Sequence, residues 1–353
     1  MKTLITGVAE FIGSNFLYYF LNQHSDCDII GIDNLTYAGN LKNFDYLNNE
    51  QKKRFQFIKS DISDYKSISD VFKNNEIDSI INFAAESHVD RSIHDPQIFL
   101  KTNIIGTQNL LHIAKENWKR EDNSYSNKKF VQISTDEVYG SLGPEGYFTE
   151  KNALDPHSPY SASKAGADLI TKAYYDTYNF PINITRCSNN YGPFQFPEKL
   201  IPLIINNCLT NKPIPIYGDG QNIRDWLYVE DHCSAIDTVL FNGHIGEVYN
   251  IGGNNEVKNI DMVKKIIKLL YEKTENNKIN DKLIKYVPDR LGHDKRYAIN
   301  STKIKTKLGW EPKASIEEGL EMTINWYLEH KKWLEDIING EYLSFYEKNY
   351  ELR

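Results

Sequence analysis

Short apolar runs alternate with longer amphipathic stretches over the first half of the chain. The short runs predict buried β-strands, and the stretches with apolar residues every three to four positions predict helices. The predicted strands are Lys2–Thr6, Asp28–Asp33, Phe55–Lys59, Ser79–Phe83, Phe130–Ser134 and Asn183–Arg186. The predicted helices between them are Ser14–Gln23, Ile68–Asn75, Ile98–Trp118 and Ser158–Tyr178. Repeated strand–helix units with short connections indicate an α/β fold with a doubly wound parallel sheet.

The pattern changes after Cys187, where proline and glycine become frequent. Such a texture is typical of short elements joined by loops. We therefore predict a first domain over residues 1–188 and a smaller C-terminal α/β domain over residues 189–353. The later elements are predicted as helices at Ile260–Leu270 and Ile316–His330, a polar loop at Asn276–Asp281, and a strand at Trp226–Glu230. That strand is expected to return to the main sheet, so a segment near 225–250 would rejoin the first domain.

A glycine-containing turn, Gly7-Val8-Ala9-Glu10-Phe11-Ile12-Gly13, joins the first predicted strand to the first predicted helix. In a strand–turn–helix–strand unit, such a turn lets the backbone approach a pyrophosphate, and the helix N-terminus attracts the negative charge. Asp33 ends the next strand, where a carboxylate can accept hydrogen bonds from an adenosine ribose and disfavours a 2′-phosphate. The unit predicts a Rossmann-type domain that binds NAD in preference to NADP.

The turn departs from the expected spacing at Glu10, where a G-x-x-G-x-x-G pattern would have a third glycine. A carboxylate there would face the pyrophosphate. Two like charges about 5 Å apart repel by on the order of 3 kcal/mol at an effective dielectric constant of about 20. We therefore expect NAD to bind more weakly than it would with glycine at this position, and equal NAD affinities of the protein and Glu10→Gly would contradict this.

Composition indicates the cellular compartment and argues against nucleic acid and membrane as partners. The 353 residues carry a net charge of −7 without a long basic run, so nucleic acid is a poor partner. No apolar run approaches the ~20 residues of a membrane span, and the first residues lack the zones of a signal peptide. The four cysteines are widely spaced without a CxxC pair, which argues against a metal site and against a disulfide framework. We expect free thiols, no bound metal and a cytoplasmic protein.

The candidate chemistry lies at the ends of two predicted elements. Thr135-Asp136-Glu137 follows a strand, and Tyr160 and Lys164 share a face near the start of a helix. Such a tyrosine can take a proton from an alcohol while a hydride leaves to a nicotinamide ring. The charges of the lysine and of the ring are expected to lower the tyrosine pKa from its usual value of about 10. Thr135 would hydrogen-bond the same alcohol, so this set predicts an oxidation step.

The two adjacent carboxyls predict a second kind of chemistry. Oxidation or epimerisation of a sugar needs only the tyrosine and the hydroxyl residue. Elimination of water beside a new ketone also needs one group that removes a carbon-bound proton and one that protonates the departing hydroxyl. Asp136 and Glu137 fit these two roles.

The second predicted domain carries cations that suit a diphosphate. Lys199, Arg224 and Arg290 lie in loop-like contexts. Arginine recognises phosphate groups through paired hydrogen bonds. Together these residues favour a nucleoside-diphosphate ligand.

These segments resemble the extended short-chain dehydrogenases/reductases, and within that family the dTDP-glucose 4,6-dehydratases. The similarity runs essentially end to end. Its most specific motifs are Thr135-Asp136-Glu137 and the run Phe196-Pro197-Glu198-Lys199-Leu200. Further similar segments are 33–41, 84–92, 134–140, 160–164, 189–193 and 224–232. One departure is Leu291, where the family usually has proline.

The resemblance implies NAD as a resident cofactor and a nucleoside-diphosphate sugar, dTDP-glucose, as the substrate. Tyr160 would take the proton of the sugar 4-hydroxyl, and Lys164 would hold the cofactor ribose. Glu137 would remove the C5 proton, and Asp136 would protonate the C6 hydroxyl as water leaves. The hydride then returns to C6 and gives a 4-keto-6-deoxy sugar nucleotide, a precursor of rhamnose or another deoxy sugar.

The strand ends and the resemblance together give the expected binding residues and partner. The dinucleotide site is expected to comprise Gly7, Phe11, Ile12, Gly13, Asp33, Asn34, Leu35, Thr36, Asp61, Ile62, Phe83, Ala84, Ala85, Ser87, Thr102, Tyr160, Lys164 and Asn190. The sugar-nucleotide site is expected to comprise Ser87, Thr135, Asn189, Lys199, Leu200, Pro215, Tyr217, Arg224, Asn259, Arg290 and His293. The resemblance also implies a homodimer, in which the helices Ile98–Trp118 and Ser158–Tyr178 form a four-helix bundle with a second copy.

Three alternatives stay open. The substrate can be UDP-glucose, because the sequence does not settle the base. The chain can be another sugar-nucleotide enzyme of the same fold, such as a 4-epimerase or a decarboxylase, although Asp136 and Glu137 argue against an epimerase. It can also be a non-catalytic relative that binds a sugar nucleotide without turnover, for which Glu10 is the only support.

Overall fold

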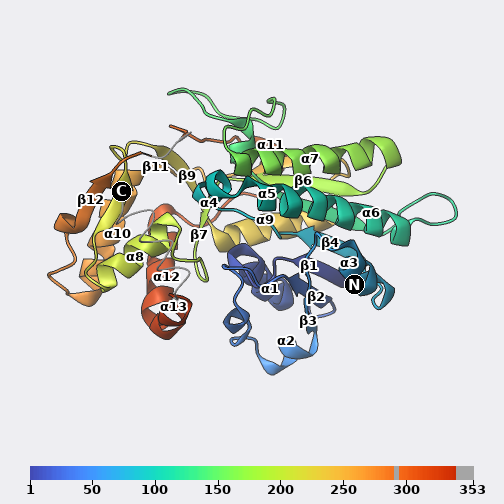
Figure 1. Ribbon diagram of the computed structural model, residues 1–353, viewed down its shortest axis with the longest axis horizontal. Helices are drawn as coiled ribbons and strands as arrows, with labels where there is room; N and C mark the ends of the chain where they lie inside the picture. The colour runs from blue at the N-terminus through green and yellow to red at the C-terminus, as the bar shows by residue number, and fades with distance from the viewer. Residues whose placement is uncertain (290–293, 339–353) are drawn as a thin grey trace.

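A seven-stranded parallel sheet forms the centre of the computed structural model, which describes residues 1–289 and 294–338 (Figure 1). Its strand order is β10-β6-β5-β4-β1-β2-β3. The strands are β1 (Lys2–Thr6), β2 (Asp28–Asp33), β3 (Phe55–Lys59), β4 (Ser79–Asn82), β5 (Lys129–Thr135), β6 (Ile182–Cys187) and β10 (Val248–Ile251). The order reverses between β1 and β4, and ligands of open α/β sheets bind at the carboxyl edge of such a reversal. The predicted doubly wound parallel sheet is confirmed.

Helices cover both faces of this sheet, because successive residues of each strand point to opposite sides. In β1, Ile5 packs into one apolar cluster and Leu4 into the other. The first cluster includes residues of α1 (Phe11–Gln23), α9 (Val229–Asn242) and α11 (Thr302–Leu308). The second cluster includes residues of α3 (Tyr65–Lys73), α6 (Thr107–Trp118) and α7 (Pro159–Tyr178). Each face of the sheet thus has its own buried core.

The helix α7 begins with a strong local signal. Ser158 is its N-cap and exchanges hydrogen bonds with Ser161, and Pro159 occupies the first helical position. This start fixes Tyr160 and Lys164 within the first two turns. The second long helix that the sequence predicts, Ile98–Trp118, consists of three consecutive segments. They are α5 (Pro96–Phe99), a π-helical segment η2 (Leu100–Gly106) and α6, and η2 packs against α7.

A smaller group of elements lies at the left of Figure 1 and has its own apolar core. Its helices are α8 (Leu200–Leu209), α10 (Asn259–Thr274), α12 (Ile316–Glu329) and α13 (Lys331–Ile337). Its strands form a sheet of β11 (Glu256–Lys258), β9 (Ile223–Tyr228) and β7 (Asn189–Tyr191), and a pair of β12 (Ile284–Val287) and β8 (Ile214–Tyr217). The remaining short elements are η1 (Leu41–Phe44), α2 (Asn49–Lys53), α4 (Val89–His94), η3 (Asp136–Tyr139) and η4 (Asp281–Leu283).

One predicted connection is wrong. Trp226–Glu230 does not return a strand to the main sheet, because Trp226–Tyr228 lie in β9 between β7 and β11. The returning strand is β10, which pairs with β6. The division of the chain into domains at residue 188 stays a prediction. Among the described residues, no helix is both long and apolar enough to cross a bilayer.

Candidate active site

Three adjoining cavities open at the carboxyl edge of the main sheet. The central cavity, about 210 Å³, is lined by Tyr160, Lys164 and the ends of β1, β4 and β5. The β2–β3 cavity, about 30 Å³, holds Asp33 and Asp61 and shares Gly7, Glu10 and Ala85 with the central cavity. The outer cavity, about 160 Å³, lies against the smaller group of elements and shares Ser87, Glu137, Asn189, Asn190, Gln195, Glu198 and Lys199 with the central cavity. The shared walls make one continuous binding region.

Almost all residues predicted for the dinucleotide lie in this region. The central cavity is lined by Gly7, Phe11, Ile12, Gly13, Phe83, Ala85, Ser87, Tyr160, Lys164 and Asn190. The β2–β3 cavity is lined by Asp33, Asn34, Thr36, Asp61, Ile62, Ala84 and Thr102. Leu35 lines neither cavity. Its backbone N–H instead donates to Asp33 Oδ1 at 2.7 Å.

The glycines of the first turn are required by space. Gly7 has a φ of +65°, and a Cβ on it would lie 2.8 Å from the Ala84 nitrogen. A Cβ on Gly13 would lie 2.1 Å from the Gly7 oxygen. Glu10 differs, because its φ of −92° and ψ of 176° suit any residue. The turn thus keeps the two glycines that its backbone needs and carries a carboxyl where the backbone needs none.

Asp33 braces this turn. Its Oδ2 accepts the Ala9 N–H at 3.0 Å and its Oδ1 accepts the Leu35 N–H. Burial raises the pKa of Asp33, and the two N–H groups oppose that shift. Each carboxylate oxygen can accept more than one hydrogen bond. A ribose can therefore still bond to Asp33 while the side chain holds the turn.

The predicted catalytic carboxyls lie in η3 at the end of β5. Thr135 caps this turn, because its Oγ1 accepts the Glu137 N–H at 3.2 Å. Asp136 is only 2% exposed, and its Oδ1 accepts a hydrogen bond from the Thr135 hydroxyl at 3.3 Å. Among the residues that the structure describes, no partner contacts Asp136 Oδ2. Burial, with Glu137 beside it, raises the pKa of Asp136 well above its usual value, so the carboxyl is set up to hold a proton.

The tyrosine and the lysine lie in the same cavity. Lys164 Nζ donates to the Ile133 carbonyl at 2.6 Å, and burial lowers its pKa. Burial raises the pKa of Tyr160 well above its usual value, Glu137 adds to the shift, and a hydrogen bond with Thr135 opposes it. In the protein alone, desolvation of the phenol outweighs the effect expected of the lysine. The lowering expected from the lysine and the nicotinamide charge together stays a prediction.

Most residues predicted for the sugar nucleotide line the outer cavity. They are Ser87, Asn189, Lys199, Leu200, Pro215, Tyr217, Arg224 and Asn259, and Thr135 lines the central cavity. Arg290 and His293 lie outside the described residues. Arg224 donates to the Asp294 carbonyl at 2.9 Å and lies over the ring of Tyr297, with its Cζ 4.3 Å from the ring centroid. Its guanidinium is thus held in place at the cavity wall.

A partly buried cluster that the sequence did not reveal lies at the wall between the central and outer cavities. Glu198 accepts a hydrogen bond from the Tyr37 hydroxyl at 2.9 Å and pairs with Arg91 at 3.3 Å. The Arg91 guanidinium lies 3.5 Å from the centroid of the Tyr37 ring. All three residues lie in segments that carry the resemblance, 33–41, 84–92 and 196–200, but nothing in those segments indicates that they meet. The partners of Glu198 come from segments far away in the chain.

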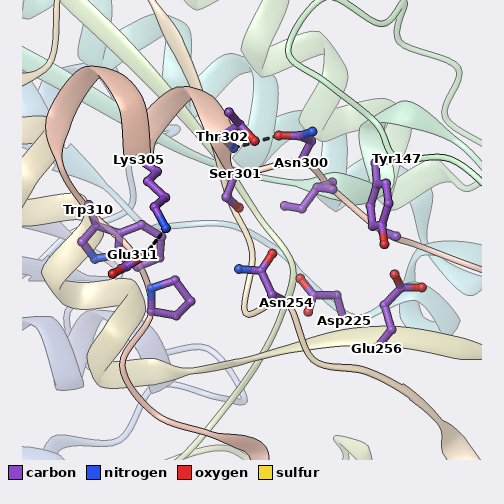
Figure 2. Close-up of a pocket in the computed structure, with 13 residues that line it drawn as sticks. Tyr147, Asp225, Asn254, Glu256, Asn300, Ser301, Thr302, Lys305, Trp310 and Glu311 are labelled. Atoms are coloured by element: carbon purple, nitrogen blue, oxygen red, sulfur yellow. Dashed lines mark hydrogen bonds and ion pairs between the residues drawn. The ribbon is translucent and has the colours of Figure 1, made fainter.

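A fourth cavity lies away from this region, and we call it the distal cavity (Figure 2). It measures about 330 Å³, and its lining residues are Tyr147, Asp225, Asn254, Glu256, the segment 298–302, Lys305, Trp310, Glu311 and Pro312. Its polar groups bond to protein: Asp225 accepts the N–H groups of Gly253 and Asn255 at 2.9 and 2.6 Å. Lys305 pairs with Glu311 at 2.5 Å, as the dashed line in Figure 2 shows.

The parallel sheet, the glycine turn and the Tyr160–Lys164 pair beside β5 define a dinucleotide-dependent enzyme of the short-chain dehydrogenase/reductase class. Residues 4–323 match the family model of GDP-mannose 4,6 dehydratase. The dTDP-glucose 4,6-dehydratase 1 of Escherichia coli (strain K12) is 47% identical over 363 residues, with 100% of both chains covered. The chain therefore belongs to the GDP-mannose 4,6 dehydratase family.

Two solved structures extend the comparison. The dTDP-glucose 4,6-dehydratase of Bacillus anthracis str. Ames in complex with NAD is 48% identical, with a TM-score of 0.85 and coverage of 96% of this chain and 99% of that one. The UDP-glucose 4-epimerase of Thermotoga maritima with UDP-glucose is 30% identical, with a TM-score of 0.81 and coverage of 93% and 99%. Both enzymes share the fold, so the identity of the reaction depends on the residues of the site.

Proposed function

We propose that the chain is a dTDP-glucose 4,6-dehydratase, an NAD-dependent lyase. The observation that carries this proposal is the position of Asp136. A buried carboxyl with a raised pKa lies beside Glu137, in the same cavity as Tyr160 and Lys164, and one of its oxygens has no hydrogen-bond partner in the described part of the chain. Oxidation alone does not need such an acid, whereas elimination of water does.

The residues of the central cavity divide the reaction between them. Tyr160, as its phenolate, accepts the proton of the sugar 4-hydroxyl, with Thr135 as its hydrogen-bonding neighbour. Burial disfavours that phenolate, and the positive charge of a nicotinamide ring, when bound, would favour it. Glu137 removes the C5 proton, which the new C4 ketone makes acidic. Asp136, holding its proton, delivers it to the departing C6 hydroxyl, so water is lost across C5–C6. The product is dTDP-4-dehydro-6-deoxy-glucose, a precursor of deoxy sugars such as rhamnose.

The β1 turn and the strand ends fit NAD. Gly7 and Gly13 leave space for the pyrophosphate to approach the backbone, and Asp33 can accept hydrogen bonds from a ribose. The small side chains of Ala84 and Ala85 let the flat cofactor lie close to the end of β4. NAD, when bound, supplies the hydride acceptor for C4 and the hydride donor for C6. Lys164 would hold its nicotinamide ribose, from a position already fixed by the Ile133 carbonyl.

The outer cavity fits the nucleoside diphosphate. Lys199 and Arg224 supply positive charge to its wall, and Pro215, Leu200 and Tyr217 supply apolar and aromatic surface. Lys199 Nζ already donates to the Ser87 carbonyl at 3.0 Å, so its ammonium group is positioned. The roles of Arg290 and His293 at this site stay predictions.

One incubation tests the proposal. The purified protein is supplied with dTDP-glucose and, separately, with UDP-glucose, and the alkaline ultraviolet absorbance of a 4-keto-6-deoxy product is followed. We expect faster product formation from dTDP-glucose. A dTDP-galactose product would indicate a 4-epimerase, and binding without any product would indicate a non-catalytic relative. Faster turnover of UDP-glucose would show that the enzyme prefers the uridine nucleotide.

A homodimer is part of the proposal. Side chains that are apolar and exposed gather on the segments that pack side by side, namely Ile98 of α5, Leu100 and Ile105 of η2, and Leu169 of α7, which is 62% exposed. A second copy of the chain would cover them in a four-helix bundle. Size-exclusion chromatography with light scattering should report a dimer, and Leu169→Glu should shift it toward monomer. A monomeric wild-type protein would contradict this assignment.

The compartment is inferred from the thiols. All four cysteines are free and buried, in agreement with a reducing cytoplasm. The described residues hold no group of three or more His, Cys, Asp or Glu side chains arranged for a metal ion.

A further inference from the structure

Glu10 occupies a position that any dinucleotide must pass. It lines both the central cavity and the β2–β3 cavity, and only Gly7 and Ala85 share that placement. The proposed function places the nicotinamide half of the cofactor beside Tyr160 and the adenosine half beside Asp33. The pyrophosphate that joins the two halves then crosses the junction at Glu10.

The same position is the N-cap of α1. The Ser14 N–H donates to the Glu10 carbonyl at 2.8 Å, and the Glu10 side chain makes no capping hydrogen bond. Orphan N–H groups at the start of a helix of 13 residues attract an anion. The Glu10 side chain thus leaves the positive end of α1 uncapped, and a pyrophosphate attracted to that end would lie beside Glu10.

The surroundings of Glu10 are mainly acidic. Facing it are Asp33 at the end of β2, Glu86 after β4, Glu198 and Lys199 before α8, Tyr37 after β2, and Lys164 of α7. Burial raises the pKa of Glu10 well above its usual value; Asp33, Glu86 and Glu198 add to the shift, and Lys199 opposes it. A bound pyrophosphate brings further negative charge to this group.

We propose that Glu10 takes up a proton when the dinucleotide binds, so that cofactor affinity falls as the pH rises. The proton comes from the buffer and converts the carboxylate to a neutral acid, whose O–H can donate to a phosphate oxygen. This inference rests on the proposed function, because it requires a dinucleotide to cross the junction. At low pH Glu10 is already protonated in the free protein, and affinity is then independent of its titration.

The sign of the effect follows from linkage. Because the bound cofactor raises the pKa of Glu10 further, the complex holds more protons than the free protein between the two pKa values. In that window the Kd for NAD rises by about tenfold per pH unit, the limit for one proton. Below the pKa of Glu10 in the free protein the Kd is flat.

The test measures NAD binding without turnover. Isothermal titration of cofactor-stripped protein is run from about pH 6 to about pH 9, at each pH in two phosphate-free buffers whose different ionisation enthalpies reveal protons taken up. Wild type should show uptake approaching one proton per NAD and a Kd that rises with pH.

The variants separate Glu10 from its neighbours. Glu10→Gln, which keeps the shape without the charge, should bind NAD with no proton uptake and with a Kd that does not change with pH, and Glu10→Gly should do the same. Glu86→Gln, which removes a neighbouring carboxyl, should keep the pH dependence.

The outcomes separate this inference from the proposed function. Equal proton uptake and equal pH profiles in wild type and Glu10→Gln would overturn the inference, with the enzyme assignment intact. Failure of wild type, Glu10→Gln and Glu10→Gly alike to bind NAD at any pH would overturn the proposed function itself.

Discussion

The central cavity and the distal cavity each contain a buried aspartate, Asp136 and Asp225, and the two differ in what their carboxyl groups bond to. In the distal cavity, the carboxylate of Asp225 accepts backbone N–H groups and Glu256 pairs with Arg296 at 2.8 Å. In the central cavity, Asp136 is equally buried but leaves Oδ2 without a partner among the described residues. Burial raises the pKa of both aspartates, and at Asp225 the loop N–H groups oppose that shift.

The difference shows how burial can serve stability or chemistry. A buried carboxylate that accepts several hydrogen bonds is stabilised in its charged form and holds the loop that supplies them. A buried carboxyl without such partners keeps its proton and can give it up only to a molecule that enters. Cavity size does not make this distinction, since the distal cavity is the larger.

The largest expected effect is at Tyr160. Tyr160→Phe keeps the ring but removes the hydroxyl whose phenolate form accepts the sugar proton, so we expect kcat to fall by ~10³. Turnover of dTDP-glucose measures this, and a binding titration with NAD serves as the control, since cofactor affinity should change little. Retention of most of the wild-type kcat would remove Tyr160 from the reaction.

Paired substitutions of the two aspartates test the comparison directly. Asp136→Asn keeps the shape but has no proton of the right acidity, so turnover should fall by ~10² while the free energy of unfolding is maintained. NADH absorbance should build up in a single turnover, because oxidation at C4 precedes the blocked elimination. Asp225→Asn should instead lose about 2 kcal/mol of stability in urea unfolding, because an amide nitrogen cannot accept the loop N–H groups.

The comparison between the cavities would be wrong if both substitutions changed the same property. A loss of stability in Asp136→Asn, or a block of the elimination step in Asp225→Asn, would contradict it. Circular dichroism of both variants at the assay temperature confirms that folded protein is being compared.

A smaller effect is expected at Arg224. Arg224→Lys keeps the charge but loses the planar guanidinium, so the KM for dTDP-glucose should rise by ~10-fold with a nearly unchanged kcat. Steady-state kinetics separate the two constants. A fall in kcat at constant KM would instead place Arg224 in the chemistry.

The smallest effect is expected in the distal cavity at the Lys305–Glu311 pair. Both side chains are more than half exposed, and such pairs contribute roughly 0–1 kcal/mol. Lys305→Ala and Glu311→Ala should therefore leave kcat within about twofold of wild type and stability within about 1 kcal/mol. Thermal unfolding and turnover assays measure both quantities. A large loss of activity in either variant would assign the distal cavity a role in the reaction.

Local patterns predicted the fold well where burial is simple. The strands β1, β2 and β3 match their predicted bounds; β1 and β2 are short buried runs, and β3 is a short run of mixed apolar and polar residues at the sheet edge. β10 was missed as a strand, because Val248-Tyr249-Asn250-Ile251 lacks a continuous apolar run and pairs with β6 through a long connection. Helix α1 begins at Phe11 and not at the predicted Ser14, because Gly13 lies within the first helical turn and does not interrupt it.

The residues of the site were also predictable only where a local pattern marks them. Residues at strand ends were predictable, since parallel strands bring their carboxyl ends to one edge. The Tyr37–Arg91–Glu198 cluster was not, because a contact over 161 positions leaves no local pattern. The raised pKa of Tyr160 was also not predictable, because the sequence does not reveal how completely the phenol is desolvated.

The backbone of the first turn has a consequence for how this protein can change over generations. Gly7 and Gly13 are fixed by space, whereas the extended conformation at position 10 admits any side chain. Substitutions at position 10 can therefore accumulate without loss of the fold, and each would set a different residence time for the cofactor. Position 10 is a place where selection, or an engineer, can adjust how firmly the enzyme keeps its cofactor while leaving its catalytic residues untouched.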